Sequence, residues 1–176
     1  MRRLFWLLAA VAAAAPADRP RAVRESLATL ERIFDSRIER QSIEDPFLLL
    51  GTTRGVYLEG YGAVLTAEVN LVTGPAITPF RPSLSKEDVA RLHAKKRQRL
   101  PVLRQLMREM LLDAAGSLEA VLAQEQIVLA VSLFYYSWED RTGLPGQILM
   151  QAQRQQLLAL KQRGAAAERA IQTKEY

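Results

Sequence analysis

The chain of 176 residues contains no cysteine and one histidine, His93. Without cysteine it can form no disulfide, no thiolate metal site and no thiol nucleophile. One histidine cannot assemble the usual zinc or transition-metal sites, and no D-x-D-x-D-G calcium loop is present. We therefore expect no metal and no cofactor, and a fold that is held together by packing alone.

Long apolar runs are also missing, apart from one at the N-terminus. Residues 4–15 are apolar, two arginines precede them, and an A-x-A cleavage pattern that ends at Ala17 follows. The run is too short to span a bilayer, so it predicts a signal peptide over residues 1–17. Cleavage is expected after Ala17, with Ala15 as a second candidate and an uncleaved anchor as the alternative. We expect an exported protein, periplasmic or extracellular.

The excess of positive charge is small. The chain has 24 lysines and arginines against 19 acidic residues, and removal of residues 1–17 lowers the net charge from +5 to +3. This balance does not by itself predict a nucleic-acid partner. The length favours a single domain over residues 18–163, followed by a loosely ordered tail over residues 164–176.

Helical periodicity appears in three segments. Residues 21–41 carry apolar side chains three or four positions apart, which predicts an amphipathic helix. A long second helix starts after Ser85, within a sequence that resembles a capping box. Pro101 predicts a kink in it, or a junction of two helices near Leu100. A short third helix is expected around Leu157.

Four segments have strand character. Residues 53–59 and 63–71 are separated by a glycine-containing turn, and residues 63–71 alternate between apolar and polar side chains. Residues 125–139 predict a central strand and residues 147–152 an edge-like strand. The expected fold is α+β, a four-stranded and mainly antiparallel sheet of two β-hairpins with helices packed on one face.

Gly60-Tyr61-Gly62 begins like the dinucleotide fingerprint G-x-G-x-x-G. The third position holds Leu65, and a strand follows where the fingerprint needs a helix. We therefore interpret the segment as a hairpin turn, in which glycines allow positive φ.

Polar side chains near this turn make it a candidate binding site. They are Tyr57, Glu59, Tyr61 and Glu68. If Glu59 and Glu68 face each other across the hairpin, they form a carboxylate pair suited to acid–base chemistry. The alternative is two solvated carboxylates. No catalytic residue is assigned, since Ser132 and Ser137 lack the G-x-S-x-G context of a hydrolase.

The densest positive charge lies in the second helix, at Arg91, Lys95, Lys96, Arg97 and Arg99. Such a basic surface could bind an anionic membrane. Nucleic acid is not expected, because no aromatic residues interleave with the charges. The alternative is a solvated helix face, which would also hold His93, since no triad partners accompany it.

A second candidate surface is aromatic. Residues 135–140 read Y-Y-S-W-E-D. Aromatic rings at the end of a strand, followed by carboxylates, could line a sugar- or peptide-binding rim. They could equally cap the core.

The run G-V-Y-x-x-G-Y-G-A-V at residues 55–64, together with F-Y-Y-S-W at 134–138, resembles a family of uncharacterised exported bacterial proteins. The resemblance covers roughly residues 54–152. It implies a single exported domain and brings no activity or ligand with it.

Three functional hypotheses follow. The first is a non-enzymatic envelope domain that binds a protein, a peptide or a glycan. The second is a carboxylate- and tyrosine-based hydrolase or small-ligand-binding protein with its site near residues 59–68. The third is a membrane-surface binder that uses residues 91–99. The oligomeric state stays open.

Overall fold

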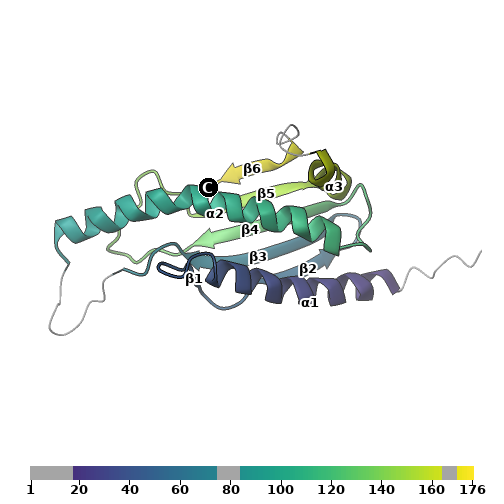
Figure 1. The fold of residues 1–176 in the computed structure, drawn as a ribbon, viewed down its shortest axis with the longest axis horizontal. Coiled ribbons are helices and arrows are strands. Elements are labelled where there is room, and N and C mark those ends of the chain that lie inside the picture. The colour runs from purple at the N-terminus through teal and green to yellow at the C-terminus, as the bar shows by residue number, and fades with distance from the viewer. Residues whose placement is uncertain (1–17, 75–83, 164–169) are drawn as a thin grey trace, which may run out of the picture.

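The computed structural model describes residues 18–74, 84–163 and 170–176, which form three helices and a six-stranded mixed sheet (Figure 1). The predicted α+β class is confirmed, and the predicted signal segment lies outside the described residues. In chain order the elements are α1 (Asp18–Glu39), β1 (Leu48–Leu49), β2 (Arg54–Leu58), β3 (Gly62–Asn70), α2 (Lys86–Ser117), β4 (Gln126–Leu133), β5 (Gln147–Gln153), α3 (Arg154–Arg163) and β6 (Gln172–Glu175).

The sheet is mixed because α2 connects two neighbouring strands. The strand order is β1-β3-β4-β5-β6, and β2 pairs with β3 on the same side as β1. Both predicted hairpins are present, since β2–β3 and β4–β5 are antiparallel. β3 and β4 are parallel, because a helical crossover returns the chain to the end at which the first strand began. The prediction of four strands was wrong in their number, and it missed this parallel pair.

The two strands that the sequence did not predict are β1 and β6. β1 has only two residues. β6 falls in the segment for which we expected a loose tail, but it pairs with β5 along residues 172–175. All four of its side chains are exposed. It therefore has no apolar alternation, and its strand conformation depends on backbone pairing. Residues 164–169 lie outside the described part of the chain.

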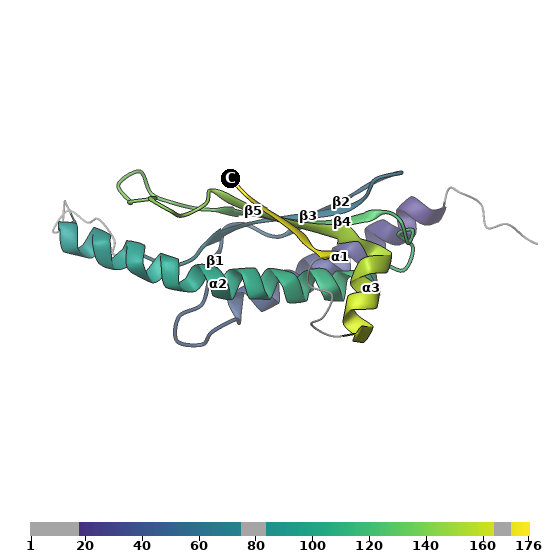
Figure 2. The same cartoon turned by 90° about the horizontal axis from the view of Figure 1, so that it is seen from above.

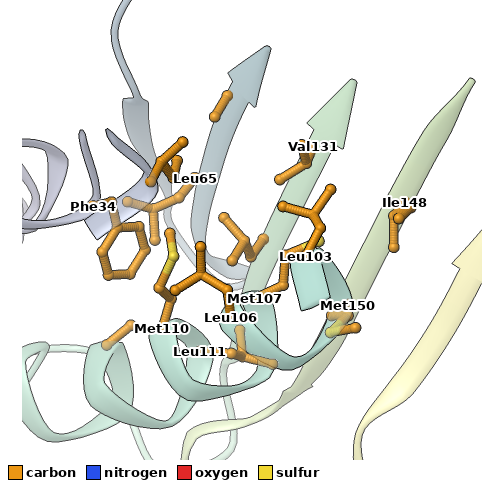
Figure 3. Close-up of a cluster of buried hydrophobic side chains, with 14 of the residues drawn as sticks. Phe34, Leu65, Leu103, Leu106, Met107, Met110, Leu111, Val131, Ile148 and Met150 are labelled. Atoms are coloured by element: carbon orange, nitrogen blue, oxygen red, sulfur yellow. The ribbon is translucent and has the colours of Figure 1, made fainter. Parts of the chain in front are cut away.

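All three helices pack on one face of the sheet (Figure 2). Alternate residues of β3, such as Leu65 and Val69, are buried beneath them, as the alternation predicted. Figure 3 shows Phe34 of α1, Met107 of α2 and Ile148 of β5 among the side chains of this core. Each such fully buried side chain contributes about 1.5–3 kcal/mol. No helix of the described residues lies on the opposite face of the sheet.

α2 is one helix from Lys86 to Ser117. The predicted capping box is confirmed, because Ser85 Oγ accepts from the Asp88 N–H at 3.1 Å and the Asp88 carboxylate accepts from the Ser85 N–H at 3.4 Å. The predicted junction of two helices is not present, and the helix continues through Pro101. Pro101 is exposed, so the carbonyl of Arg97, which loses its helical donor there, can be solvated.

α1 closes the outer edge of β2 with its side chains. Glu31 Oε1 accepts from the Gly55 N–H at 2.8 Å, and Arg24 donates both to Glu31 at 2.8 Å and to the Gly55 carbonyl at 3.0 Å. Asp35 accepts from the Thr53 N–H at 2.7 Å. Burial raises the pKa of Glu31, but the hydrogen bonds from Arg24 and Gly55 outweigh it and lower the pKa overall. These bonds occupy edge groups that would otherwise pair with another strand.

The predicted turn between β2 and β3 is confirmed. Gly60 has φ 79° and Gly62 has φ 135°, values that side-chain-bearing residues rarely adopt. A Cβ on Gly60 would meet no atom within 4 Å, whereas a Cβ on Gly62 would collide with the backbone carbonyl of Gln126 in β4. Gly62 thus lets the parallel strands β3 and β4 approach each other where they begin.

We predict that Gly62→Ala destabilises the fold much more than Gly60→Ala. The Gly60 substitution should cost about 1–2 kcal/mol, the conformational penalty alone. The Gly62 substitution adds a backbone collision that must separate β3 from β4. Urea unfolding of both variants measures the difference, and equal losses of stability would contradict this account of Gly62.

Candidate functional site

The residues predicted around the first hairpin do not form one site. Glu59 and Tyr61 are exposed in the turn. Glu68 is exposed near the other end of β3, six residues beyond Gly62, which corresponds to about 20 Å of extended strand. The hairpin register separates Glu59 from Glu68 by most of the strand, so the two do not form a facing carboxylate pair. The alternative of two solvated carboxylates agrees with their exposure.

Tyr57, the fourth of these residues, has a structural partner. Its hydroxyl donates to Glu125 at 3.0 Å, and the buried Glu125 carboxylate also accepts from the Leu122 N–H at 2.9 Å. Burial raises the pKa of Tyr57, and the hydrogen bond to Glu125 raises it further. This pair ties β2 to the turn that precedes β4. Tyr57 and Glu125 lie 68 residues apart in the chain, and no local sequence pattern signals their contact.

The predicted basic surface is only partly external, because Lys96 and Arg99 are buried whereas Arg91, Lys95 and Arg97 are exposed. The side chains of Lys96 and Glu139 are 0% and 3% exposed, and their charged atoms lie 2.5 Å apart. Lys96 also donates to the Phe134 carbonyl at 3.2 Å and lies 4.7 Å from the ring centroid of Tyr135. Burial lowers the pKa of Lys96, and Glu139 opposes that shift in part. A sequence signal existed, because Lys96 lies four residues after Leu92, within the apolar stripe of the helix.

Two further cations of the run bind the loop between α1 and β1. Arg99, which is 9% exposed, lies 2.5 Å from the Asp45 carboxylate and stacks 4.4 Å from the ring centroid of Phe47. Lys95 lies 2.8 Å from the same carboxylate. Arg91 contacts Asp88 only at 3.9 Å and, like Arg97, is exposed. The prediction that Lys96 and Arg99 belong to a basic surface was wrong, because both side chains are buried and form ion pairs with acidic residues that are distant in sequence.

His93 is not on a freely solvated face either. Its Nε2–H donates to the Thr142 carbonyl at 2.8 Å and joins α2 to the loop between β4 and β5. That loop begins at Phe134, because β4 ends at Leu133 and not at the predicted residue 139.

The aromatic segment of this loop packs on itself. The rings of Tyr136 and Trp138 are parallel, with centroids 5.4 Å apart, and the Phe134 ring meets Tyr136 edge to face at 4.9 Å. The Tyr135 hydroxyl donates to the Pro145 carbonyl at 2.8 Å, and burial raises its pKa to about 12. A sugar ring needs an uncovered aromatic face on which to stack, and Tyr136 already shares one with Trp138. Tyr135 and Trp138 pack against the core, as the core-capping interpretation requires, whereas Tyr136 is 43% exposed.

An open groove of about 640 Å³ lies between α1 and α2, lined by residues that include Arg37, Gln41, Val102, Gln105, Leu106 and Glu109. It contains none of the predicted site residues.

Within residues 18–74, 84–163 and 170–176, no group of three or more histidine and acidic side chains could hold a metal ion. None of the helices in these ranges is long and apolar enough to cross a membrane.

The most distinctive surface is the sheet face turned away from the helices, which we call the open sheet face (Figure 2). Its centre is aliphatic, although none of the helices α1, α2 and α3 covers it. Val56, Val64 and Val128 lie side by side in register across β2, β3 and β4. We define the apolar patch as Val56, Leu58, Val64, Val128, Ala130 and Leu149. Val56 is 48% exposed and Leu58 is 47% exposed.

The rest of the open sheet face is polar but carries little charge. Pleating places five glutamines on this side: Gln126, Gln147, Gln151, Gln153 and Gln172. The charged side chains that alternation places on this face of β2 to β6 are Arg54, Glu68 and Lys174. The helices, by contrast, bear most of the ion pairs, such as Arg37–Asp113 at 2.6 Å and Lys161–Asp113 at 2.9 Å.

Comparison with known proteins adds no relative. No family model matches the chain, and searches of the curated proteins and of the solved structures return no significant match.

The buried Lys96–Glu139 pair generates a stability prediction. Lys96→Met leaves the Glu139 carboxylate buried without its cation, so it should cost about 3–5 kcal/mol of unfolding free energy. The double variant Lys96→Met/Glu139→Leu should lose less, because no unpaired charge remains. The matched control is Lys95→Met on the same helix, whose partly exposed ion pair should contribute at most about 1 kcal/mol. Chemical denaturation measures all three, and similar losses for Lys96→Met and Lys95→Met would refute the assignment.

Proposed function

We propose that this chain is an exported bacterial protein whose mature part is a non-enzymatic interaction domain. Its binding surface is the open sheet face, and its partner is another polypeptide. The observation that carries the proposal is the apolar patch, where Val56 and Leu58 stay about half exposed on a face without a helix. Exposed aliphatic groups that adjoin each other mark interaction sites, because leaving them in water is unfavourable.

The chemistry of the patch favours a protein partner over a glycan. Its six side chains are all aliphatic, whereas sugar recognition commonly uses aromatic rings, and the aromatic segment at residues 134–138 is not part of the patch. Few charges surround the patch, which is how the centres of protein interfaces differ from other surfaces. The glutamine amides around it can donate and accept hydrogen bonds at the rim.

Two alternatives are less well supported by the geometry. A carboxylate-based site near the hairpin would need Glu59 and Glu68 together, and the strand length separates them. Binding to an anionic membrane would need a free basic helix, and Lys95, Lys96 and Arg99 have acidic partners.

Export generates a prediction of its own. α1 begins at Asp18, so cleavage after Ala17 would leave every described element intact. Intact-mass measurement of the protein that accumulates in its host should give a chain beginning at Asp18. Ala17→Arg should block that cut, because the position before the cut requires a small residue. A chain that keeps residues 1–17 and stays in the cytoplasm would refute export.

The binding surface can be tested by site-specific cross-linking. We predict that a photo-reactive amino acid in place of Val56 gives a covalent adduct with a protein, identifiable by mass spectrometry after irradiation of the source bacterium. The matched control replaces Ile33 of α1, which is 42% exposed on the helical side. An adduct from position 33 but none from position 56 would contradict the proposal. Adducts at position 56 that contain only this chain would identify a second copy as the partner.

A further inference from the structure

The open sheet face has the properties of a surface that can stack on itself. Its apolar patch spans β2 to β5, with Val56 near one edge and Leu149 nearer the other. Val128 and Ala130, between them, are only 3% and 8% exposed. The centre of the face is thus already closed by neighbouring side chains, and a flat partner could cover it without inserting anything between the strands. Another β-sheet is such a partner, since sheets stack face to face about 10 Å apart.

Charge does not oppose self-association on this face. The whole chain has a net charge of +5, and two such surfaces would in general repel each other. On the open sheet face the charges nearly balance, because Glu68 offsets one of the two cations, Arg54 and Lys174, and leaves a net charge of +1. Arg54 pairs with Thr66, so Glu68 is its diagonal neighbour, two residues further along β3. A twofold axis that passes in the interface between Arg54 and Glu68 sets each Arg54 against Glu68 of the second copy.

The edges of the sheet are less suitable for a second copy. At the β2 edge, Glu31 and Arg24 of α1 already hold the N–H and the carbonyl of Gly55. At the other edge, β6 has only four residues, and one of them is Lys174. Short edge strands and lysine are features that block strand pairing between molecules. A contact between copies is therefore expected on the face and not along an edge.

The size of the face is sufficient for a dimer of moderate affinity. Five strands at about 4.8 Å spacing and about seven residues of strand length give a footprint of roughly 500 Å². Side-chain relief makes the accessible area larger than this footprint. Specific interfaces bury about 800 Å² per partner, and weaker ones bury less.

We infer that the partner of the open sheet face is a second copy of this chain, and that the two open sheet faces stack about a twofold axis with the apolar patches between them. The inference rests on the proposed function, because it names the polypeptide that the binding surface takes. It also assigns the helices to the outside of the dimer, where their charged side chains stay in water.

Sedimentation equilibrium of the purified protein, as it accumulates in its host, tests the inference from about 1 to about 100 µM, a range suited to micromolar dissociation constants. We expect a monomer–dimer equilibrium. Val56→Lys should raise the dissociation constant at least about tenfold, because it places a charge in the apolar interface. Ile33→Lys, a matched substitution on the helical side, should leave it unchanged. Leu149→Lys provides a second test on another strand, and circular dichroism shows whether each variant is folded.

A protein that stays monomeric throughout this range would overturn the inference. The inference would also be overturned if the Val56→Lys and Leu149→Lys variants are folded and still dimerise, since such a dimer must use another surface. A monomer that still cross-links from position 56 to a different protein would overturn the inference that the partner is a second copy, and the proposed function would still hold. Absence of any protein adduct at position 56 would remove the proposed function itself.

Discussion

The length of α2 is the constraint on which the other features depend. Its 32 residues extend about 48 Å, whereas the nine residues of β3 cover about 30 Å. The helix must connect two parallel strands, so it lies along the sheet and continues beyond the strand ends (Figure 1). Beyond the strand ends, the first half of α2 does not pack on the sheet. The loops around Asp45 and Glu139 pack against that half, and they bury Arg99 and Lys96 in the process.

The same crossover explains the contrast between the two faces of the protein. α2 joins β3 to β4 across one side of the sheet, and α1 and α3 pack beside it, with Asp113 of α2 binding Arg37 of α1 and Lys161 of α3. Ion pairs of this kind need neighbouring helices, so they gather on the helical side. None of the three helices that the structure describes lies on the open sheet face, so their charges are absent from it. Its aliphatic and amide character is therefore what distinguishes it from the helical side.

Local patterns in the sequence predicted the features that local physics determines. The alternation in β3, the capping box before α2 and the positive φ of Gly60 in the first turn each depend on neighbouring residues alone, whereas the need for glycine at position 62 also involves Gln126 of β4. The misread features depend on distant partners. Lys96 resembles a surface lysine until Glu139 is placed against it, and β6 has no pattern because β5 supplies all of its pairing. The separation of Glu59 from Glu68 follows from a strand register that composition does not fix.

A comparison of two strands of the same sheet indicates that the apolar patch needs an explanation other than its position on a face without a described helix. Antiparallel strands that face water on one side alternate between apolar and polar residues. β5 follows this rule at Gln147, Gln151 and Gln153 and departs from it on its open side only at Leu149. β2 breaks it, since Val56 and Leu58 point outward while Tyr57 between them packs toward the core. Because both strands belong to one open face, exposure to solvent alone cannot explain an aliphatic β2, whereas contact with a second apolar surface can.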